Sequence, residues 1–324
     1  MKIAEILKAN ILKYAQTFDG DLQSLEPLKI EASGRKYFRA SSANSSYVIS
    51  HDDSRVNGQL VFINRANELA DCNVRVPKIF KYELDSNLTI LEDLGDHSLI
   101  DEKNFYQQER LVHSSLELLN QMHQSEHVDL HSTFWMGLES HAKKFSKVFC
   151  MEFLGLEMFD GYKDLYLDMR PQIMDQQWTN CHFDFERRNI HVIDNNELAL
   201  IDFQDMCFGP IGIDLAGILI DHYTPCKIDT IKKYCNSFSE LSVYGISAED
   251  IFSATLWGGL QRNLRIMGTL TELYLRLNRS FRMRDLPQIV LNTAIISKEL
   301  NQVSLANFLN DNVSQTLSYK LANL

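Results

Sequence analysis

The sequence predicts an α+β fold of two lobes, a small antiparallel sheet followed by a mainly helical part. Short runs rich in β-forming residues, bounded by Ser, Gly, Asn and Asp, fill most of residues 1–93. From residue 94 to residue 324, apolar residues recur at spacings of three and four, as on one face of a helix. A chain of 324 residues, 45% of them hydrophobic, is long enough to bury two cores.

The first lobe, residues 1–93, is expected to hold one sheet and two helices. Apolar residues between positions 3 and 12 fit one face of a helix, and "GQLVFINRANELADC" (58–72) has the same spacing. The runs expected to form strands are "LKIEA" (28–32), "YFRAS" (37–41), "SYVIS" (46–50), "KIFKYEL" (78–84) and "LTILE" (88–92).

The second lobe, residues 94–324, is expected to be helical apart from one hairpin. Helical spacing covers residues 102–124, 211–223, 227–241, 248–268 and 286–310. Ser247 is a candidate N-cap, and Pro287 suits the start of the last long helix. Only "NIHVID" (189–194) and "ELALIDF" (197–203) are expected to form strands here, joined by a tight turn.

Composition excludes several classes of protein. The formal net charge of −11 argues against general nucleic-acid binding, which needs a basic surface. The six cysteines form no C-x-x-C pair, which favours reduced thiols and a cytoplasmic location. No apolar run is long enough for a membrane span. The N-terminal run is interrupted by charged residues, which the apolar region of a signal peptide would not tolerate. No feature points to a protein partner.

The stretch "HFDFERRN" (182–189) spaces His182, Asp184 and Asn189 as H-x-D-x-x-x-x-N, and Asp202 ends the hairpin that follows. Phosphoryl transfer needs a base that accepts the proton of the attacking hydroxyl, and oxygen ligands that hold Mg²⁺ against the nucleotide phosphates. Asp184 suits the first role, and Asn189 and Asp202 suit the second. His182 is expected to brace the loop without chemistry of its own.

Together with these motifs, several longer segments resemble the aminoglycoside phosphotransferase and choline kinase superfamily, which has a protein-kinase-like fold. Within it, the sequence is most similar to the bacterial anomeric kinases of N-acetylmuramate and N-acetylglucosamine, which serve cell-wall sugar recycling. The segments that carry the likeness are "SGRKYFRA" (33–40), "LEDLGDHSL" (91–99), "HFDFERRNI" (182–190), "LIDFQDMCFGPIGIDLAGIL" (200–219) and "GGLQRNLRIMGTLTEL" (258–273).

The resemblance implies a nucleotide-binding lobe over residues 1–93 and a catalytic, substrate-binding lobe over residues 94–324. It implies that Asp184 is the catalytic base, that Asn189 and Asp202 ligate Mg²⁺, and that Asp214 braces the catalytic loop. ATP would meet backbone groups of an interlobe hinge. That hinge comprises Glu92, Asp93, Leu94 and Gly95.

The first lobe departs from the protein-kinase pattern. It has no G-x-G-x-x-G, and Ser50 stands where the strand lysine of V-A-I-K would be. Arg35, Lys36 or Arg39 could supply the missing positive charge, and Arg35 and Lys36 are preferred because they flank the expected phosphate loop. The alternative is that these residues are solvated turn charges.

The residues after Asp184 bear on the acceptor. A polycationic aminoglycoside needs a ring of carboxylates, whereas Arg187 and Arg188 fit a neutral or anionic sugar, because arginine can grip a carboxylate with two hydrogen bonds. One of the two could instead face the phosphates of ATP.

Further polar residues are candidates for binding the sugar. Gln204 and Asp205 could hydrogen-bond its hydroxyls or acetamide, or Asp205 could cap local backbone. Gln261 and Arg262 lie on an apolar-periodic helix, where a substrate role and a buried pair bracing two helices are both open.

The sequence therefore predicts a cytoplasmic kinase that uses ATP and Mg²⁺ to phosphorylate the anomeric hydroxyl of N-acetylmuramate or N-acetylglucosamine. The alternatives are a kinase of another hydroxylated metabolite or antibiotic, and a non-catalytic pseudokinase that binds nucleotide.

Overall fold

The computed structural model describes residues 2–28, 35–52, 58–125, 140, 142–157, 159–193 and 196–324. It divides into two compact units. The small unit contains the described residues of Met1–Ser98, Ser125–Val128 and Ile190–Gln204, and the large unit contains those of Leu99–Gln124, Asp129–Asn189 and Asp205–Leu324. Each unit thus contains several separate segments of the chain. The sequence predicts instead two continuous lobes with one boundary at residue 93, and that boundary stays a prediction.

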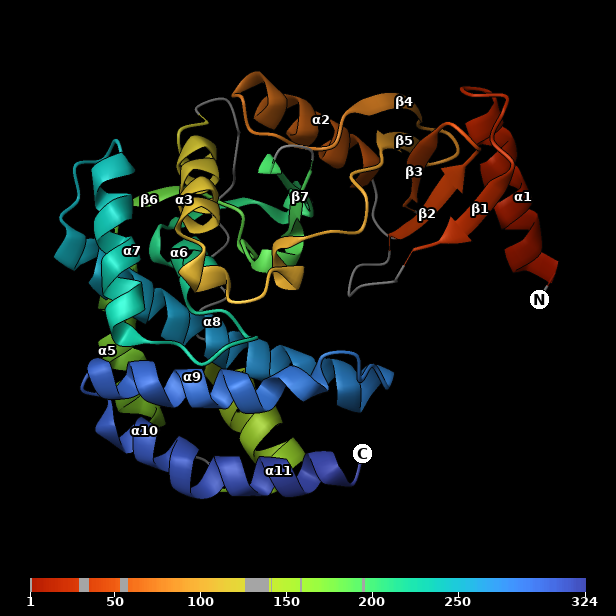
Figure 1. Ribbon diagram of the computed structural model, residues 1–324. Helices are drawn as coiled ribbons and strands as arrows, with labels where there is room; N and C mark the ends of the chain where they lie inside the picture. Colours follow the sequence, from red (N-terminus) through yellow and green to blue (C-terminus); the bar gives the residue numbers. More distant parts are fainter. Residues whose placement is uncertain are drawn as a thin grey trace. The chain divides into compact units, whose positions relative to one another are not determined.

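The small unit is built on a five-stranded antiparallel sheet (Figure 1). The strand order is β1-β2-β3-β5-β4, with β1 Ser24–Pro27, β2 Lys36–Ser41, β3 Ser46–His51, β4 Ile79–Glu83 and β5 Leu88–Glu92. The predicted strands over 37–41, 46–50, 78–84 and 88–92 are confirmed, whereas most of "LKIEA" lies outside the described residues.

Both predicted helices of the small unit are present, α1 (Lys2–Gln16) and α2 (Gly58–Asp71). Alternation along the strands explains how α1 docks on the sheet, since successive side chains point to opposite faces. The core between α1 and the sheet comprises Ile11, Tyr14, Ala15, Leu22, Phe38, Ala40, Ile49, Leu88 and Ile90.

The predicted hairpin belongs to the small unit. Strands β7 (Ile190–Val192) and β8 (Leu198–Leu200) pair antiparallel. The Leu200 N–H donates to the Arg75 carbonyl (2.8 Å), and the Val192 N–H donates to the His97 carbonyl (3.0 Å). These backbone hydrogen bonds fix the segment that leads to Asp202.

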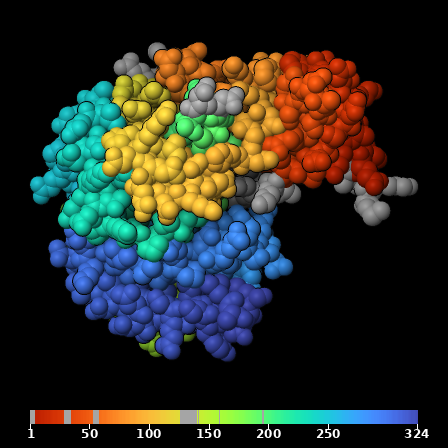
Figure 2. All heavy atoms as spheres, in the orientation of Figure 1, coloured from red at the N-terminus to blue at the C-terminus, as the bar shows by residue number. Residues whose placement is uncertain are grey.

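The large unit is mainly helical. Its helices are α3 (Glu109–His123), α5 (Tyr162–Met174), α6 (Gly212–Leu219), α7 (Ile228–Leu241), α8 (Ala248–Leu277), α9 (Leu286–Glu299), α10 (Val303–Phe308) and α11 (Ser314–Ala322), with π-helical turns at Phe145–Leu154 and Leu309–Val313. In Figure 1, α9 runs beside α8, and the space-filling view shows the C-terminal helices as one continuous surface (Figure 2). No helix in the described ranges is both long and apolar enough to cross a membrane.

The predicted helix boundaries at Ser247 and Pro287 are confirmed. The Ser247 hydroxyl accepts a hydrogen bond from the Asp250 N–H (3.1 Å) and caps α8, and Pro287 lies in the first turn of α9. The expectation that the hairpin holds the only strands of this part of the chain is wrong. Strands β6 (Trp178–Cys181) and β9 (Cys207–Pro210) also pair, and their short, polar or Gly-Pro sequences carry little strand signal.

Helices α6 and α8 approach each other at the level of their backbones. A Cβ on Gly258 would lie 2.3 Å from the Gly212 carbonyl oxygen, and a Cβ on Gly212 would lie 1.9 Å from the Ala254 carbonyl oxygen. Only glycine allows such an approach. The position of α6, which carries Asp214, therefore depends on this crossing.

We expect Gly258→Ala to lower the free energy of unfolding by at least about 2 kcal/mol, because neither backbone can move away without repacking α6. Urea unfolding followed by circular dichroism measures the change. Gly20→Ala is the matched control, since a Cβ there meets nothing within 4 Å. Equal stability of the two variants would contradict the backbone contact.

Candidate active site

The loop that holds the central motif begins where β6 ends, at Cys181. Phe183 has a φ of 74°, in the left-handed region that non-glycine residues rarely adopt. Such a conformation costs about 1–3 kcal/mol and persists only where surrounding contacts enforce it. Strain of this kind is common at functional sites, and Phe183 immediately precedes Asp184.

Asp214, on α6, enforces the shape of this loop. Its carboxylate is fully buried and accepts hydrogen bonds from the backbone N–H of His182 (2.6 Å) and of Phe183 (2.8 Å). Burial raises the pKa of Asp214 to about 6, although these donors favour the ionised form. One turn later, a Cβ on Gly217 would lie 2.3 Å from the Phe185 carbonyl oxygen, so α6 lies directly against the loop.

Asp184 presents its carboxylate at the surface of the large unit, with 45% of the side chain exposed. Asn189 closes the loop, because its Nδ2 donates to the Asp184 carbonyl oxygen (2.9 Å). This leaves Oδ1 of Asn189 as an oxygen ligand for a metal. Oxygen donors of this type are what Mg²⁺ requires.

Asp202 lies in the small unit, after β8, with a φ of 64°. Its Oδ1 accepts a hydrogen bond from Nε2 of Gln204 (2.7 Å), and the ring of Phe203 stacks on that of Phe62 from α2, with centroids 5.0 Å apart. That hydrogen bond does not involve Oδ2 of Asp202, which is an oxygen donor of the type that suits Mg²⁺. The neighbouring Asp205 is exposed and belongs to the large unit.

Glu186 is the centre of a buried charged cluster in the large unit. It pairs with Nη2 of Arg262 (2.7 Å) and with Arg188, and Arg282 approaches to 3.7 Å. Burial would raise the pKa of Glu186, but the three arginines outweigh it and hold the pKa well below its ordinary value. Arg262 also contacts Nε2 of His222 (2.7 Å), so it ties α8 to two residues outside helices rather than to a second helix.

Arg187 points into the interior rather than towards solvent. Its Nη1 lies 2.8 Å from the buried Asp221 carboxylate, Nε donates to the Leu99 carbonyl (2.9 Å) and Nη2 to the Glu102 carbonyl (2.8 Å). Its guanidinium also lies 4.9 Å from the centre of the Phe105 ring. The prediction that Arg187 grips a substrate carboxylate is not supported by this geometry, because its donors are already engaged.

Arg35, a candidate for the phosphates, is likewise engaged within the small unit. Its Nη2 lies 2.8 Å from Asp52 at the end of β3 and 3.2 Å from the Gly58 carbonyl at the start of α2, and its guanidinium stacks on Phe62. It thus ties β2 and β3 to α2. Lys36, the other candidate, is only partly buried at the start of β2.

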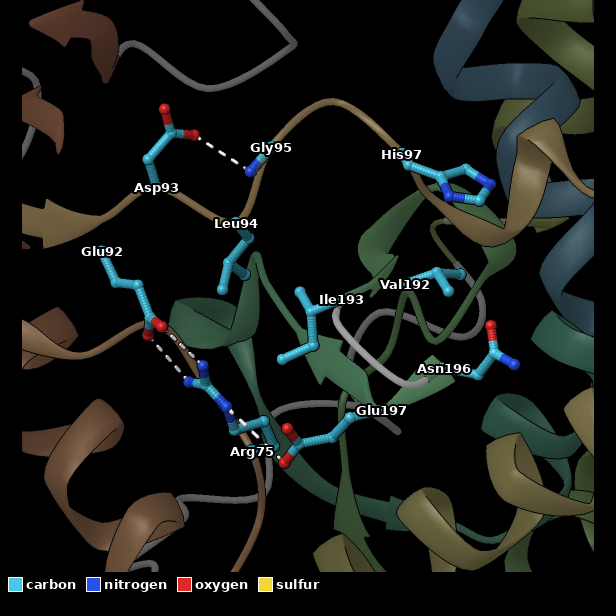
Figure 3. Close-up of a pocket in the computed structure, with 10 residues that line it drawn as sticks. All are labelled: Arg75, Glu92, Asp93, Leu94, Gly95, His97, Val192, Ile193, Asn196 and Glu197. Carbon is cyan, nitrogen blue, oxygen red and sulfur yellow. Dashed lines mark hydrogen bonds and ion pairs between the residues drawn. The ribbon is translucent and has the colours of Figure 1, made fainter. Parts of the chain in front are cut away.

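A cavity of about 570 Å³ lies where β5 ends (Figure 3). Its walls are Glu92–Gly95, Arg75, His97 and the β7–β8 hairpin, so the four residues of the expected hinge all line it. Arg75 bridges the carboxylates of Glu92 (2.6 Å) and Glu197 (3.8 Å). Among the described residues none hydrogen-bonds the backbone of Leu94, which leaves that backbone for a ligand.

One residue near Asp184 was not foreseen as part of the site. Nη2 of Arg265, on α8, lies 3.5 Å from Oδ1 of Asp184 and 3.2 Å from the Phe183 carbonyl oxygen. Its spacing from Arg262, one turn earlier on the same helix, was the available signal.

Comparison with known proteins identifies relatives of this chain. A model of the phosphotransferase enzyme family matches residues 24–232. The N-acetylmuramate/N-acetylglucosamine kinase of Neisseria meningitidis serogroup B is 24% identical over 278 residues, which cover 80% of this chain and 81% of that protein.

Solved structures resemble the chain in fold. Choline kinase LicA from Streptococcus pneumoniae has a TM-score of 0.63 at 13% identity, over 93% of this chain and all of that one (100%). Spectinomycin phosphotransferase APH(9)-Ia, solved with ADP and spectinomycin, has a TM-score of 0.61 at 13% identity, over 95% of this chain and 98% of that one. These likenesses confirm the predicted protein-kinase-like α+β fold.

Asp214 is expected to make stability depend on pH. Its folded pKa of about 6 exceeds the ordinary 3.8, so the folded protein holds this proton more tightly than the unfolded chain. That stabilisation is complete below about pH 4 and is lost as the pH rises through 6. The free energy of unfolding of the wild type relative to Asp214→Asn should therefore fall by up to about 3 kcal/mol from pH 4 to pH 6.5, measured by urea unfolding.

Asp229→Asn, which removes an exposed carboxylate at the start of α7, is the control for the loss of a carboxylate as such. If the difference in free energy of unfolding between wild type and Asp214→Asn does not vary with pH, Asp214 titrates alike in the folded and unfolded states, contrary to this expectation.

Arg187→Met should lower the free energy of unfolding by about 3 kcal/mol, because it leaves Asp221 buried without its cation. Lys233→Met, which breaks the exposed pair with Glu109, should cost less than about 1 kcal/mol. Chemical denaturation compares the two. A stable Arg187→Met protein that binds substrate poorly would restore the substrate role predicted from the sequence.

Proposed function

The chain belongs to the phosphotransferase enzyme family, and from that premise we propose that it is an ATP-dependent amino-sugar kinase. The proposed acceptor is the hydroxyl on C1, the anomeric carbon, of N-acetylmuramate or N-acetylglucosamine. The likeness to the Neisseria kinase of these sugars carries the proposal, since it extends over about four fifths of both chains. The product would be the sugar 1-phosphate.

In this proposal Asp184 is the catalytic base. Its exposed carboxylate accepts the proton of the C1 hydroxyl as that oxygen attacks the γ-phosphorus of ATP. The P–O bond to the leaving ADP breaks as the new P–O bond forms. Asp214 and His182 contribute by holding the loop through the backbone contact described above.

Asn189 and Asp202 would hold Mg²⁺ through Oδ1 of the amide and Oδ2 of the carboxylate, the atoms that their other hydrogen bonds leave available. When bound, this ion neutralises charge on the phosphate groups of ATP. The orientation of each side chain is set within its own unit, by the Asp184 carbonyl for Asn189 and by Gln204 for Asp202.

The nucleotide would be held by the small unit. Its adenine would meet backbone groups of Glu92 and Leu94, while Asp93 is occupied by Arg39, whose Nε lies 2.7 Å from that carboxylate. Because Arg35 is committed to Asp52, Lys36 is the better candidate for a phosphate contact.

The acceptor argument rests on charge. Glu186 is surrounded by three arginines, so the cluster is not the ring of carboxylates that a polycationic antibiotic or choline would need. Arg188 is the most exposed of the three, with 19% of its side chain accessible, and suits the lactyl carboxylate of N-acetylmuramate. Gln204 and Asp205 are proposed to hydrogen-bond sugar hydroxyls or the acetamide.

A coupled assay of ADP release tests the function. We expect turnover with Mg-ATP and N-acetylmuramate or N-acetylglucosamine, and none with choline or kanamycin. Asp184→Asn should lower kcat by about 100- to 10,000-fold, because the base is removed while the shape of the side chain is kept. Phosphorus NMR of the product should show a phosphate on the anomeric carbon.

Asp229→Asn, which removes an exposed carboxylate at the start of α7, is the control and should retain most activity. Turnover with kanamycin alone would overturn the acceptor argument. A folded protein that binds ATP without turnover on any acceptor would establish the pseudokinase alternative, which the absent strand lysine motivates.

A further inference from the structure

Helix α8 directs two arginines at the catalytic loop. Arg262 and Arg265 are three residues apart and so lie on the same face of the helix. Arg262 is fully buried and pairs with Glu186, a residue of the loop. Arg265 contacts the residues that present the catalytic carboxylate, and 13% of its side chain remains exposed.

Arg265 makes three contacts with Phe183 and Asp184. Its Nη2 lies 3.2 Å from the Phe183 carbonyl oxygen and 3.5 Å from Oδ1 of Asp184, and its guanidinium carbon lies 4.0 Å from the centre of the Phe183 ring. Its Nε–H is buried without an acceptor among the described residues, which costs about 1–3 kcal/mol. An arginine held in place with its Nε–H buried at such a cost calls for a functional explanation.

The strained residue Phe183 is thereby held from both ends. On its N–H side the carboxylate of Asp214 accepts a hydrogen bond, and on its carbonyl side the guanidinium of Arg265 donates one. The two groups are of opposite charge and match the two ends of the backbone dipole. Neither contact alone fixes the direction in which the next side chain, that of Asp184, projects.

We propose that Arg265 is a positioning residue for the catalytic base, one that holds Oδ1 of Asp184 so that Oδ2 faces the acceptor hydroxyl. This inference rests on the proposed role of Asp184. A planar guanidinium can reach the Phe183 carbonyl and the Asp184 carboxylate together, which the single ammonium of lysine cannot do with the same rigidity. The 3.5 Å separation is a loose contact of the kind that tightens when substrate binds.

The test measures Arg265→Ala and Arg265→Lys in the ADP-release assay with the preferred sugar. For Arg265→Ala we expect kcat to fall about 10- to 100-fold, because a misdirected base loses near-attack geometry. KM for ATP and for the sugar should stay within about threefold, since the contact acts in the chemical step. Added guanidinium ion should restore kcat severalfold, and Arg265→Lys should be intermediate.

Arg276→Ala is the matched control. Arg276 lies further along α8, is exposed and pairs with Glu152, so its loss should leave kcat unchanged and guanidinium should have no effect. Three results would overturn the inference: an unchanged kcat in Arg265→Ala, a fall in kcat that guanidinium does not restore in folded protein, or an equal rise in both KM values with kcat intact.

If Arg265→Ala does not fold, Arg265→Lys decides, and wild-type kcat in that variant would overturn the inference. Asp184→Asn separates this inference from the proposed function. Full activity of Asp184→Asn would remove the base itself from the mechanism, whereas an inactive Asp184→Asn beside a fully active Arg265→Ala would remove only the role of Arg265.

Discussion

One buried carboxylate, that of Asp214, accepts hydrogen bonds from the backbone N–H groups of His182 and Phe183, and the shape of the loop that carries Asp184 depends on this contact. Buried N–H groups must find acceptors, and here the loop finds them on a helix whose residues are all buried. The left-handed conformation of Phe183 is held by the same contact. The conformation of the loop thus depends on the packing of α6 against α8, because that packing positions Asp214.

The charged side chains of "DFERRN" differ in how deeply they are buried. Arg187 pairs with Asp221, and Glu186 pairs with Arg262, each inside the large unit. Only Asp184 keeps a carboxylate that is about half exposed. A stretch that appears uniformly charged in sequence therefore consists of the buried, paired Glu186 and Arg187 and the more exposed Asp184 and Arg188, since an isolated buried charge would be too costly.

The sequence was sufficient for the architecture and for the central motif. Short runs rich in β-forming residues predicted four strands of the sheet but not β1, and the cap at Ser247 and the proline at 287 predicted two helix starts. It was not sufficient for β6 and β9, whose polar or Gly-Pro sequences carry little strand signal. Nor could it tell the inward Arg187 from the outer Arg188, because side-chain direction in an irregular loop follows no periodicity.

Gly217 lies one turn beyond Asp214, where the Phe185 carbonyl leaves no room for a side chain. Random mutagenesis would yield inactive variants at this position, although Gly217 touches no ligand and has no side chain to lose. Scored by activity alone, such variants would be mistaken for losses of a catalytic group. In this chain a residue can therefore be intolerant to substitution without taking part in the chemistry. Gly217, which packs against the loop, is such a residue.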